Sequence, residues 1–452
     1  MQAVPKKELS LFDSTCIIVG IIIGAGIYQM APAIASGAGS SWGVLAIWVV
    51  GGLLSLCGAL GYAELATAYP KEGGDYVYLS RAYGRWAGYL FGWIQLTIVR
   101  PGDIAIMAFA FATYGRAIYN VIPGLPESYS MRLYAAAAAA VLTAVNILGV
   151  KEGKWTQNIL TTVKALGLLA IVAAALLSPQ KAPAMDKFTN PALDGVDSIP
   201  PTLALIFVLF VYGGWNEMAY VAAEVKNPRR NIVRALVLGT TAVMVLYLLV
   251  NGAFLHTLGY KGMVASKAVA ADSISTVFPQ TAGRLISTLV CISALGAVNG
   301  LIFTGARISY AMGAEHRLFR ALGNWHPRTG TPLWALLVQG VIAVAFIVVF
   351  GSFIDTVIYT AAAVYSFYLA TNLAVIVLRF REPQTERPYR VTGFPVTTLI
   401  FCAACAMLIH SSIKYAYAFK RTSLLVLACT LAAGILIYLL FERPRAGRSN
   451  QS

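Results

Sequence analysis

The chain has 452 residues, of which 58% are hydrophobic and only 12% are charged, about half the charged share of a soluble domain. This composition excludes a disordered chain, which needs low hydrophobicity and high charge, and it leaves too little polar surface for a soluble fold of this size. The net charge of +15 is compatible with nucleic-acid binding, but basic residues also accumulate in the cytoplasmic loops of membrane proteins.

Twelve apolar segments follow one another along the chain. A transmembrane helix needs roughly 20 apolar residues, so we predict an all-α polytopic membrane protein with twelve transmembrane helices, surrounded by membrane lipid. The first segment is too long for a cleavable signal, and no small-residue cleavage site follows it. The predicted spans are 11–36, 42–66, 86–116, 132–150, 155–178, 199–224, 232–257, 284–312, 332–351, 354–379, 395–413 and 422–441.

The distribution of basic residues predicts the orientation. With the amino terminus inside, 22 Lys and Arg lie on the inner side and 10 on the outer side. This bias predicts both termini in the cytoplasm and a multi-pass protein of the cell (inner) membrane. Because the basic residues are dispersed among loops, we expect no nucleic-acid partner.

The reactive side chains form no recognisable catalytic group. All six cysteines lie within apolar segments and the four histidines are scattered, so the sequence shows no metal-ligand or Ser/His/Asp cluster. We therefore expect no catalytic residue, metal or cofactor, and no enzyme. A channel would need a selectivity filter or ring, and no such repeat is visible.

Two spans are interrupted by glycine. The first contains Gly24-Ala25-Gly26 within VGIIIGAGIYQMAP, and the sixth contains Gly213-Gly214 within FVLFVYGGWNEMAY. Close helix packing is one explanation. Interruptions at corresponding places in two halves favour another, an inverted-repeat transporter with its site at the bilayer midplane. Free N–H groups at such a break suit a carboxylate and free carbonyls suit an ammonium, which indicates a zwitterionic substrate.

Five segments together carry a family resemblance: IIVGIIIGAGIY (17–28), YAELATAYPKEGGDYVYLSRAYG (62–84), FVYGGWNEMAYVAAEVKNPRRNI (210–232), GAVNGLIFTGAR (296–307) and LRFREPQTERPYRV (378–391). With them the chain resembles the L-type amino-acid transporter branch of the amino acid–polyamine–organocation (APC) superfamily, as a prokaryotic-like stand-alone member.

The resemblance implies a LeuT-like fold, in which helices 1 and 6 are broken and ten spans form a 5+5 inverted repeat. Residues 1–178 and 199–380 would be the two five-helix repeats, 391–441 the two extra helices and 442–452 a cytoplasmic tail. It also implies a sodium-independent amino-acid transporter, an exchanger of neutral and also basic L-amino acids by alternating access. A proton-coupled amino-acid or polyamine symporter is the alternative.

The same resemblance implies the residues of the substrate site. The substrate carboxylate would meet backbone N–H groups, and the ammonium would meet backbone carbonyls. Phe210 matches an aromatic gate over the substrate, while Trp215 and Asn216 match positions that shape the side-chain pocket. The implied N–H groups are those of Ala25, Gly26 and Ile27, and the implied carbonyls those of Ile22, Phe210 and Gly213.

Lys164 lies in the fifth span, about nine residues or roughly 13 Å from its start. A lysine at this depth is a functional candidate, and the alternative is a side chain that snorkels to the cytoplasmic end. By resemblance, its ammonium occupies the place of a sodium ion and bridges the first helix near Gly20 to the eighth near Thr304.

This sequence departs from the family pattern at two places. Ala25 stands where relatives have a serine, and only Thr304 keeps a hydroxyl in the TGAR motif of the eighth span. The segment 117–131 contains no cysteine, so we expect no disulfide-linked accessory glycoprotein.

Several charged residues allow two interpretations. Arg100 and Asp103 share a helix face, as an internal pair or as a polar wall of the permeation path. Glu217 could select a cationic side chain or pair with a neighbour. We interpret Glu64 and Glu224 as structural or inner-gate ion pairs.

Three further local patterns predict structure. Ser10 and Asp13 predict a capping box at the start of the first span. Residues 69–84 predict an interfacial helix or hairpin, and 262–279 a partly helical external loop.

Overall fold

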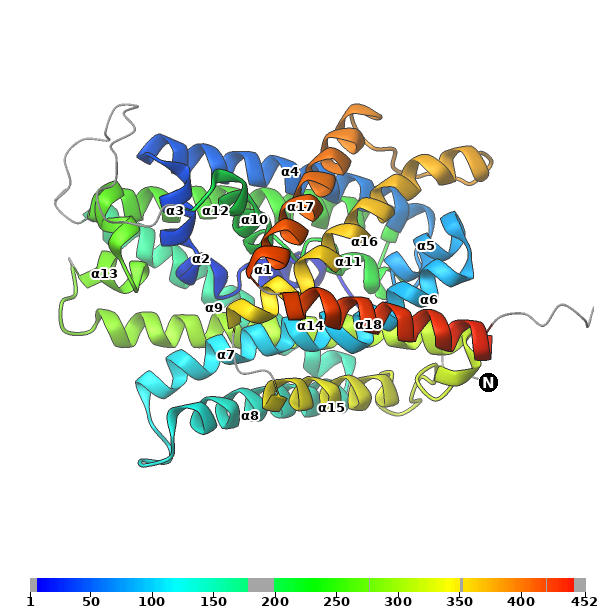
Figure 1. Cartoon of the computed structure of the whole chain (residues 1–452), viewed down its shortest axis with the longest axis horizontal. Helices are drawn as coiled ribbons and strands as arrows, with labels where there is room; N and C mark the ends of the chain where they lie inside the picture. Colours follow the sequence, from blue (N-terminus) through cyan, green and yellow to red (C-terminus); the bar gives the residue numbers. More distant parts are fainter. Residues whose placement is uncertain (1–5, 178–198, 276, 350–352, 420, 443–452) are drawn as a thin grey trace, which may run out of the picture.

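The computed structural model describes residues 6–177, 199–275, 277–349, 353–419 and 421–442. Within these residues the chain is almost entirely helical, and most of the long helices run along one common direction (Figure 1). The helices, in chain order, are α1 (Leu11–Ile22), α2 (Gly26–Gln29), α3 (Ala31–Ala38), α4 (Ser41–Ala68), α5 (Asp75–Tyr83), α6 (Arg85–Ile94), η1 (Gln95–Val99), α7 (Arg100–Ile118), α8 (Glu127–Leu148), α9 (Val150–Leu177), α10 (Pro201–Val211), α11 (Glu217–Tyr220), η2 (Ala222–Glu224), α12 (Pro228–Ala265), α13 (Val269–Ser275), α14 (Ala282–Glu315), η3 (Arg317–Phe319), α15 (Leu333–Val349), α16 (Phe353–Arg381), α17 (Val396–Phe419), α18 (Arg421–Ile437) and η4 (Tyr438–Glu442).

The helices match the twelve predicted spans. In the described residues, ten helices are long and apolar enough to cross a membrane, and α10 and α15 are two shorter apolar helices. The predicted all-helical, polytopic fold with a broken first and sixth span is thus confirmed. The division of the chain into two repeats at residues 178 and 199 stays a prediction.

Burial separates a central group of helices from a peripheral one. The most apolar stretches of α1–α2, α6–α7 and α14 are each more than 70% buried, whereas that of α18–η4 is only 6% buried. Large apolar side chains are exposed on the peripheral helices, for example Leu166 and Leu169 on α9 and Leu425 and Leu440 near the end of the chain. An outward apolar belt of this kind suits contact with lipid.

The start of α1 is fixed by local and distant contacts. The predicted capping box is present, because Ser10 accepts from the Asp13 backbone and Asp13 accepts from the Ser10 backbone. Asp13 also accepts hydrogen bonds from Asn158, at 2.7 Å, and Lys154, at 3.5 Å, both on α9. Just before the cap, Leu9 forms a two-way backbone pair with the segment after η2, through the Leu9 N–H to Glu224 O and the Lys226 N–H to Leu9 O.

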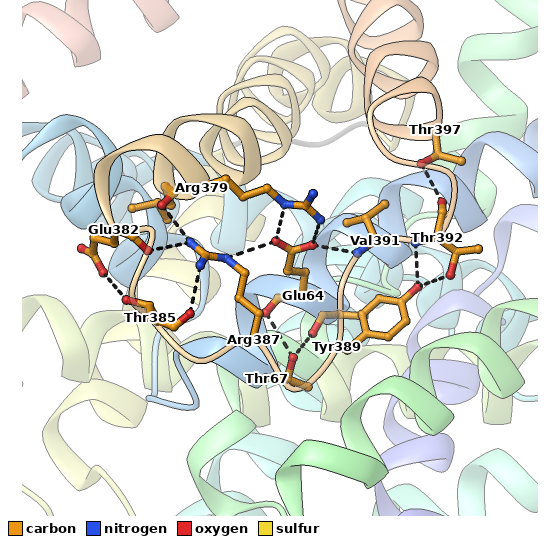
Figure 2. Close-up of polar contacts among 12 residues, drawn as sticks. Glu64, Thr67, Arg379, Glu382, Thr385, Arg387, Tyr389, Val391, Thr392 and Thr397 are labelled. Atoms are coloured by element: carbon orange, nitrogen blue, oxygen red, sulfur yellow. Dashed lines mark hydrogen bonds and ion pairs between the residues drawn. The ribbon is translucent and has the colours of Figure 1, made fainter.

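Two buried ion pairs lie at the end of the bundle that carries the N-terminus. Arg307 donates from Nε and Nη2 to Glu224, at 2.8 and 3.1 Å. Figure 2 shows the second: the Glu64 carboxylate of α4 lies between Arg379 and Arg387 and also accepts the Val391 N–H, at 2.7 Å. The predicted ion pairing of both glutamates is confirmed, and Glu64 joins α4 to the loop between α16 and α17.

The two predicted connecting segments are partly helical, as expected. The segment 69–84 contains α5, from Asp75 to Tyr83. In the segment 262–279, α12 continues to Ala265 across a non-helical Gly259, and α13 follows. Their positions relative to the membrane stay predictions. The polar stretch 179–198 lies outside the described residues.

We predict that Glu64→Gln destabilises the protein by about 2 kcal/mol. The amide removes the charge that compensates two arginines, but it keeps an acceptor, and Arg379 is partly exposed, so the cost lies below that of a fully buried pair. Thermal unfolding in detergent would measure the loss. The control is Glu386→Gln, because Glu386 pairs with Arg229 at the surface and its loss should cost about 0.5 kcal/mol or less. Equal melting temperatures for the two variants would contradict this role of Glu64.

Candidate functional site

Both glycine-containing spans are broken at the predicted positions. The first helix stops at Ile22, passes through non-helical residues 23–25 and resumes as α2 at Gly26. The sixth stops at Val211 and resumes as α11 at Glu217. Gly214 has φ +116°, a left-handed conformation that side chains with a Cβ rarely adopt. The broken-helix interpretation is therefore correct, and the glycines do more than allow close packing.

The two breaks lie directly against each other. A Cβ on Gly214 would come within 2.7 Å of the Ile21 side chain, and a Cβ on Gly26 would come within 2.8 Å of Val211. The Tyr247 hydroxyl, from α12, donates to Ile22 O at 2.9 Å and also lies 3.5 Å from Val211 O. Tyr247 thus contacts the last carbonyls of both interrupted helices.

A cavity of about 100 Å³ opens at the two breaks. Four predicted site residues line it: Ile22, Gly26, Phe210 and Gly213. Ala25 and Ile27 are fully buried next to it and are not in its lining. The wall combines α1, α2, α7, α10, α11, α14 and α16 through Ile21, Ile22, Gly24, Gly26, Asp103, Ile106, Met107, Ile206, Leu209, Phe210, Val211, Gly213, Gly214, Glu217, Ala297, Leu301, Val364, Tyr365 and Tyr368.

The backbone N–H and carbonyl groups at the breaks differ in whether they already have hydrogen-bond partners within the protein. The first N–H groups of a helix have no partner within it, which applies to Gly26 and Ile27 at the start of α2. Ile22 O, in contrast, already accepts from the Tyr247 hydroxyl and from the Gly24 N–H, at 2.8 Å. The Ile22 carbonyl is therefore a less accessible partner for an ammonium than the sequence suggested.

Lys164 is completely buried and does not snorkel. Its Nζ donates to Gly20 O at 2.5 Å, Ile23 O at 2.9 Å and Ser293 O at 3.1 Å. The ammonium thus holds the end of α1 against α14. The predicted contact near Gly20 is present, but the predicted partner Thr304 is wrong, because Ser293 lies eleven residues earlier on α14, roughly 16 Å along the helix.

Thr304 instead belongs to a second polar group, which includes Glu217 of the cavity wall. Its hydroxyl donates to Glu217 at 2.5 Å, and Arg100 Nη2 donates to the other oxygen of Glu217 at 2.8 Å. Arg100 is only 2% exposed. The interpretation of Arg100 and Asp103 as an internal pair is wrong, because Arg100 reaches across to α11, and Glu217 pairs with a neighbour.

Asp103 is left without such a partner. Its carboxylate is half-buried, lines the main cavity, and makes no hydrogen bond or ion pair with any residue that the structure describes. A second cavity of about 30 Å³ adjoins the first and is also lined by Asp103. Gln95 and Arg100 also line it, and Gln95 Oε1 and the Nε and Nη1 of Arg100 are buried polar atoms with no hydrogen-bond partner among the described residues.

The predicted side-chain pocket residues are held in place by aromatic and hydrogen-bonding neighbours. Asn216 accepts from the Tyr368 hydroxyl at 2.8 Å and donates to the Tyr220 hydroxyl at 2.9 Å. It lines the small cavity and not the large one. Trp215 packs edge-on against Tyr62, with ring centroids 5.1 Å apart. Neither residue lines the main cavity.

Below this layer lies a buried carboxylate that the sequence did not single out. Asp75, at the start of α5, accepts hydrogen bonds from three hydroxyls, those of Tyr62, Tyr220 and Thr371. Tyr247, Ser293 and Tyr368 were missed as well. The only signal for them is a polar group within an apolar span, and this signal is too common to pick out tyrosine and serine.

Comparison with known proteins shows the family to which the chain belongs. A family model described as an amino acid permease matches residues 9–437. The b(0,+)-type amino acid transporter 1 of Mus musculus is 32% identical over 445 residues, covering 98% of this chain and 89% of the relative. The large neutral amino acids transporter small subunit 2 of Homo sapiens is 32% identical over 410 residues, covering 88% and 75%. With a family match over almost its whole length, the chain belongs to the amino acid permease family, within the APC superfamily, and is similar to its L-type transporters.

Proposed function

We propose that this protein is a sodium-independent exchanger of neutral and basic L-amino acids that works by alternating access. The observation that carries the proposal is the pair of helix breaks opening onto one cavity. Free N–H groups at the start of α2 and carbonyls at the end of α10 offer an anionic and a cationic partner at fixed spacing, as a zwitterion requires.

The substrate contacts follow from the same geometry. The carboxylate would bind the N–H groups of Gly26 and Ile27, with Ala25 at the turn before them. The ammonium would bind the carbonyl of Gly213 and that of Phe210, which also accepts the Gly213 N–H at 2.9 Å, and the part played by the Ile22 carbonyl is reduced by Tyr247. Phe210 would cover the bound substrate, while Trp215 and Asn216 would support the pocket through their neighbours.

The position of Lys164 supports independence from sodium. Its ammonium fixes a positive charge among three backbone carbonyls between α1 and α14. Carbonyls in this arrangement are also the ligands that a sodium ion would use in broken-helix transporters. A built-in cation makes a transported one unnecessary there.

The cavity wall supports the substrate classes. Met107, Leu209, Phe210 and Leu301 give it an apolar surface suited to neutral side chains. Asp103 adds one carboxylate without a partner among the described residues, which suits a cationic side chain. The names of the relatives, which include large neutral amino acids, are consistent with the neutral class.

We further propose a stand-alone protein in the cell (inner) membrane with both termini in the cytoplasm. The distribution of basic residues supports this orientation. Although one relative is named as a small subunit, the segment 117–131 offers no cysteine for a disulfide to a partner. A function in transport also accounts for the cavity without a catalytic group.

An exchange assay in proteoliposomes tests the proposal. We expect that internal L-leucine stimulates uptake of labelled external L-leucine several-fold, because a carrier that returns only when loaded needs a substrate on both sides. Replacement of sodium by choline should leave the uptake unchanged. Uptake that is independent of internal substrate would contradict exchange, and loss of uptake in choline would contradict sodium independence.

We predict that Lys164→Ala abolishes exchange or uncouples it from internal substrate. Without the ammonium, three buried carbonyls at the end of α1 lose their donor, and the break is no longer held against α14. Lys151→Ala is the matched control, because Lys151 lies exposed on the same helix and its loss should have no effect. Elution of both variants as single species from gel filtration would show that they fold, and coupled uptake by folded Lys164→Ala would refute the assignment.

A further inference from the structure

The charges around the substrate cavity do not balance. Among the described residues that line its two cavities are three carboxylates, those of Asp75, Asp103 and Glu217, and one cation, Arg100, while the Lys164 ammonium lies outside both linings on the Gly20, Ile23 and Ser293 carbonyls. Glu217 is neutralised by Arg100, and Asp75 is held by three hydroxyl donors. Asp103 alone has neither an ion pair nor a hydrogen bond among the described residues, although an isolated charge at this depth is costly.

Among the described residues, the charged groups that share a cavity lining with Asp103 are Glu217 of α11, which lines both cavities, and Asp75 and Arg100, which line the small one. Arg100 lies one turn away on α7, but its Nη2 is directed to Glu217. The cavity walls contributed by α14 and α16 consist of Ala297, Leu301, Val364, Tyr365 and Tyr368, of which only the tyrosines titrate, as phenols. Helices α8 and α15 also pack against α7. Neither contributes a described residue to the lining of either cavity.

The small cavity beside Asp103 gives independent evidence of a missing partner. Gln95 and Arg100 line it, and Gln95 Oε1 and the Nε and Nη1 of Arg100 have no hydrogen-bond partner among the described residues. Gln95 and Arg100 are 6% and 2% exposed. A buried polar pocket of this kind suits water, which would link Asp103 to Gln95 and provide a route for a proton.

We propose that Asp103 holds a proton while a neutral amino acid is bound and releases it when a basic amino acid brings its own positive charge. The inference rests on the proposed exchange function and adds a transported proton to it. The carboxylate then pairs with the ammonium or guanidinium of the basic side chain. The loaded carrier carries the same net charge with either substrate class.

The stoichiometry follows from this substitution. When one basic amino acid enters with Asp103 ionised, the carrier returns with one neutral amino acid and one proton on Asp103. One positive charge moves in and one moves out, so the exchange is electroneutral and the proton travels against the basic amino acid. Exchange of two neutral or of two basic amino acids moves no net proton.

The test uses the full-length protein in vesicles with a pH-sensitive dye inside. L-Lysine outside exchanges for L-leucine inside, while potassium and valinomycin on both sides clamp the membrane potential at zero to exclude secondary proton leaks. We expect the lumen to become alkaline, by one proton for each lysine taken up, and an imposed potential not to alter the rate. Lysine uptake that follows the potential and moves no proton would overturn the proposal.

Variants at Asp103 locate the effect. The Asp103→Asn variant should bind lysine about tenfold more weakly. Its residual lysine–leucine exchange should respond to an imposed potential and should move no proton. Asp103→Glu should restore the proton movement. The control is Asp272→Asn, an exposed aspartate on α13, which should behave as wild type. Proton movement in Asp103→Asn equal to that of wild type would overturn the role of Asp103.

The wild-type protein separates this inference from the proposed function. Exchange of leucine for leucine without any acceptance of lysine would overturn the proton substitution and leave amino-acid exchange intact. Absence of exchange with every amino acid tested would overturn the proposed function and this inference with it.

Discussion

A backbone group that leaves a helix inside a membrane must find another partner, and this constraint organises the centre of the molecule. The ends of α1 and α10 lie close together, since Tyr247 contacts the last carbonyl of each, and the protein supplies donors from three surrounding helices. Lys164 comes from α9, Tyr247 from α12 and Ser293 from α14, where the Ser293 hydroxyl donates to Ile23 O and Gly24 O. The groups that these donors leave free form the wall of the cavity.

Buried charged groups are likewise matched by partners. Each buried carboxylate among the described residues has a defined set of partners: Asp13 has Ser10 and Asn158, Glu64 and Glu224 have arginines, Glu217 has Arg100 and Thr304, and Asp75 has three hydroxyls. These pairs join helices that are far apart in the sequence and so define the packing of the bundle. Asp103, which is half-buried and lines the cavity, has no hydrogen bond or ion pair among the described residues, and for this reason we propose a role for it in transport and not in packing.

The features that could be predicted are those that depend on residues close together in the sequence. The spans follow from apolar length, the capping box from the spacing of Ser10 and Asp13, and the breaks from paired glycines in apolar runs. Partners across helices were harder. Arg100 and Asp103 are neighbours on one helix face, yet Arg100 pairs with Glu217, 117 residues away. Choosing Ser293 over Thr304 as the partner of Lys164 requires knowing the axial offset of α9 and α14, which no local pattern records.

The backbone pair between Leu9 and the Glu224–Lys226 segment has a mechanical meaning. It ties the beginning of α1 to the chain just after α11, so the two half-helices on that side of the breaks share one attachment. They cannot separate unless both hydrogen bonds break. We therefore expect α1 and α11 to move together in any motion that opens this end of the cavity. The glycine-containing breaks would act as hinges, and α2 and α10 would keep their positions.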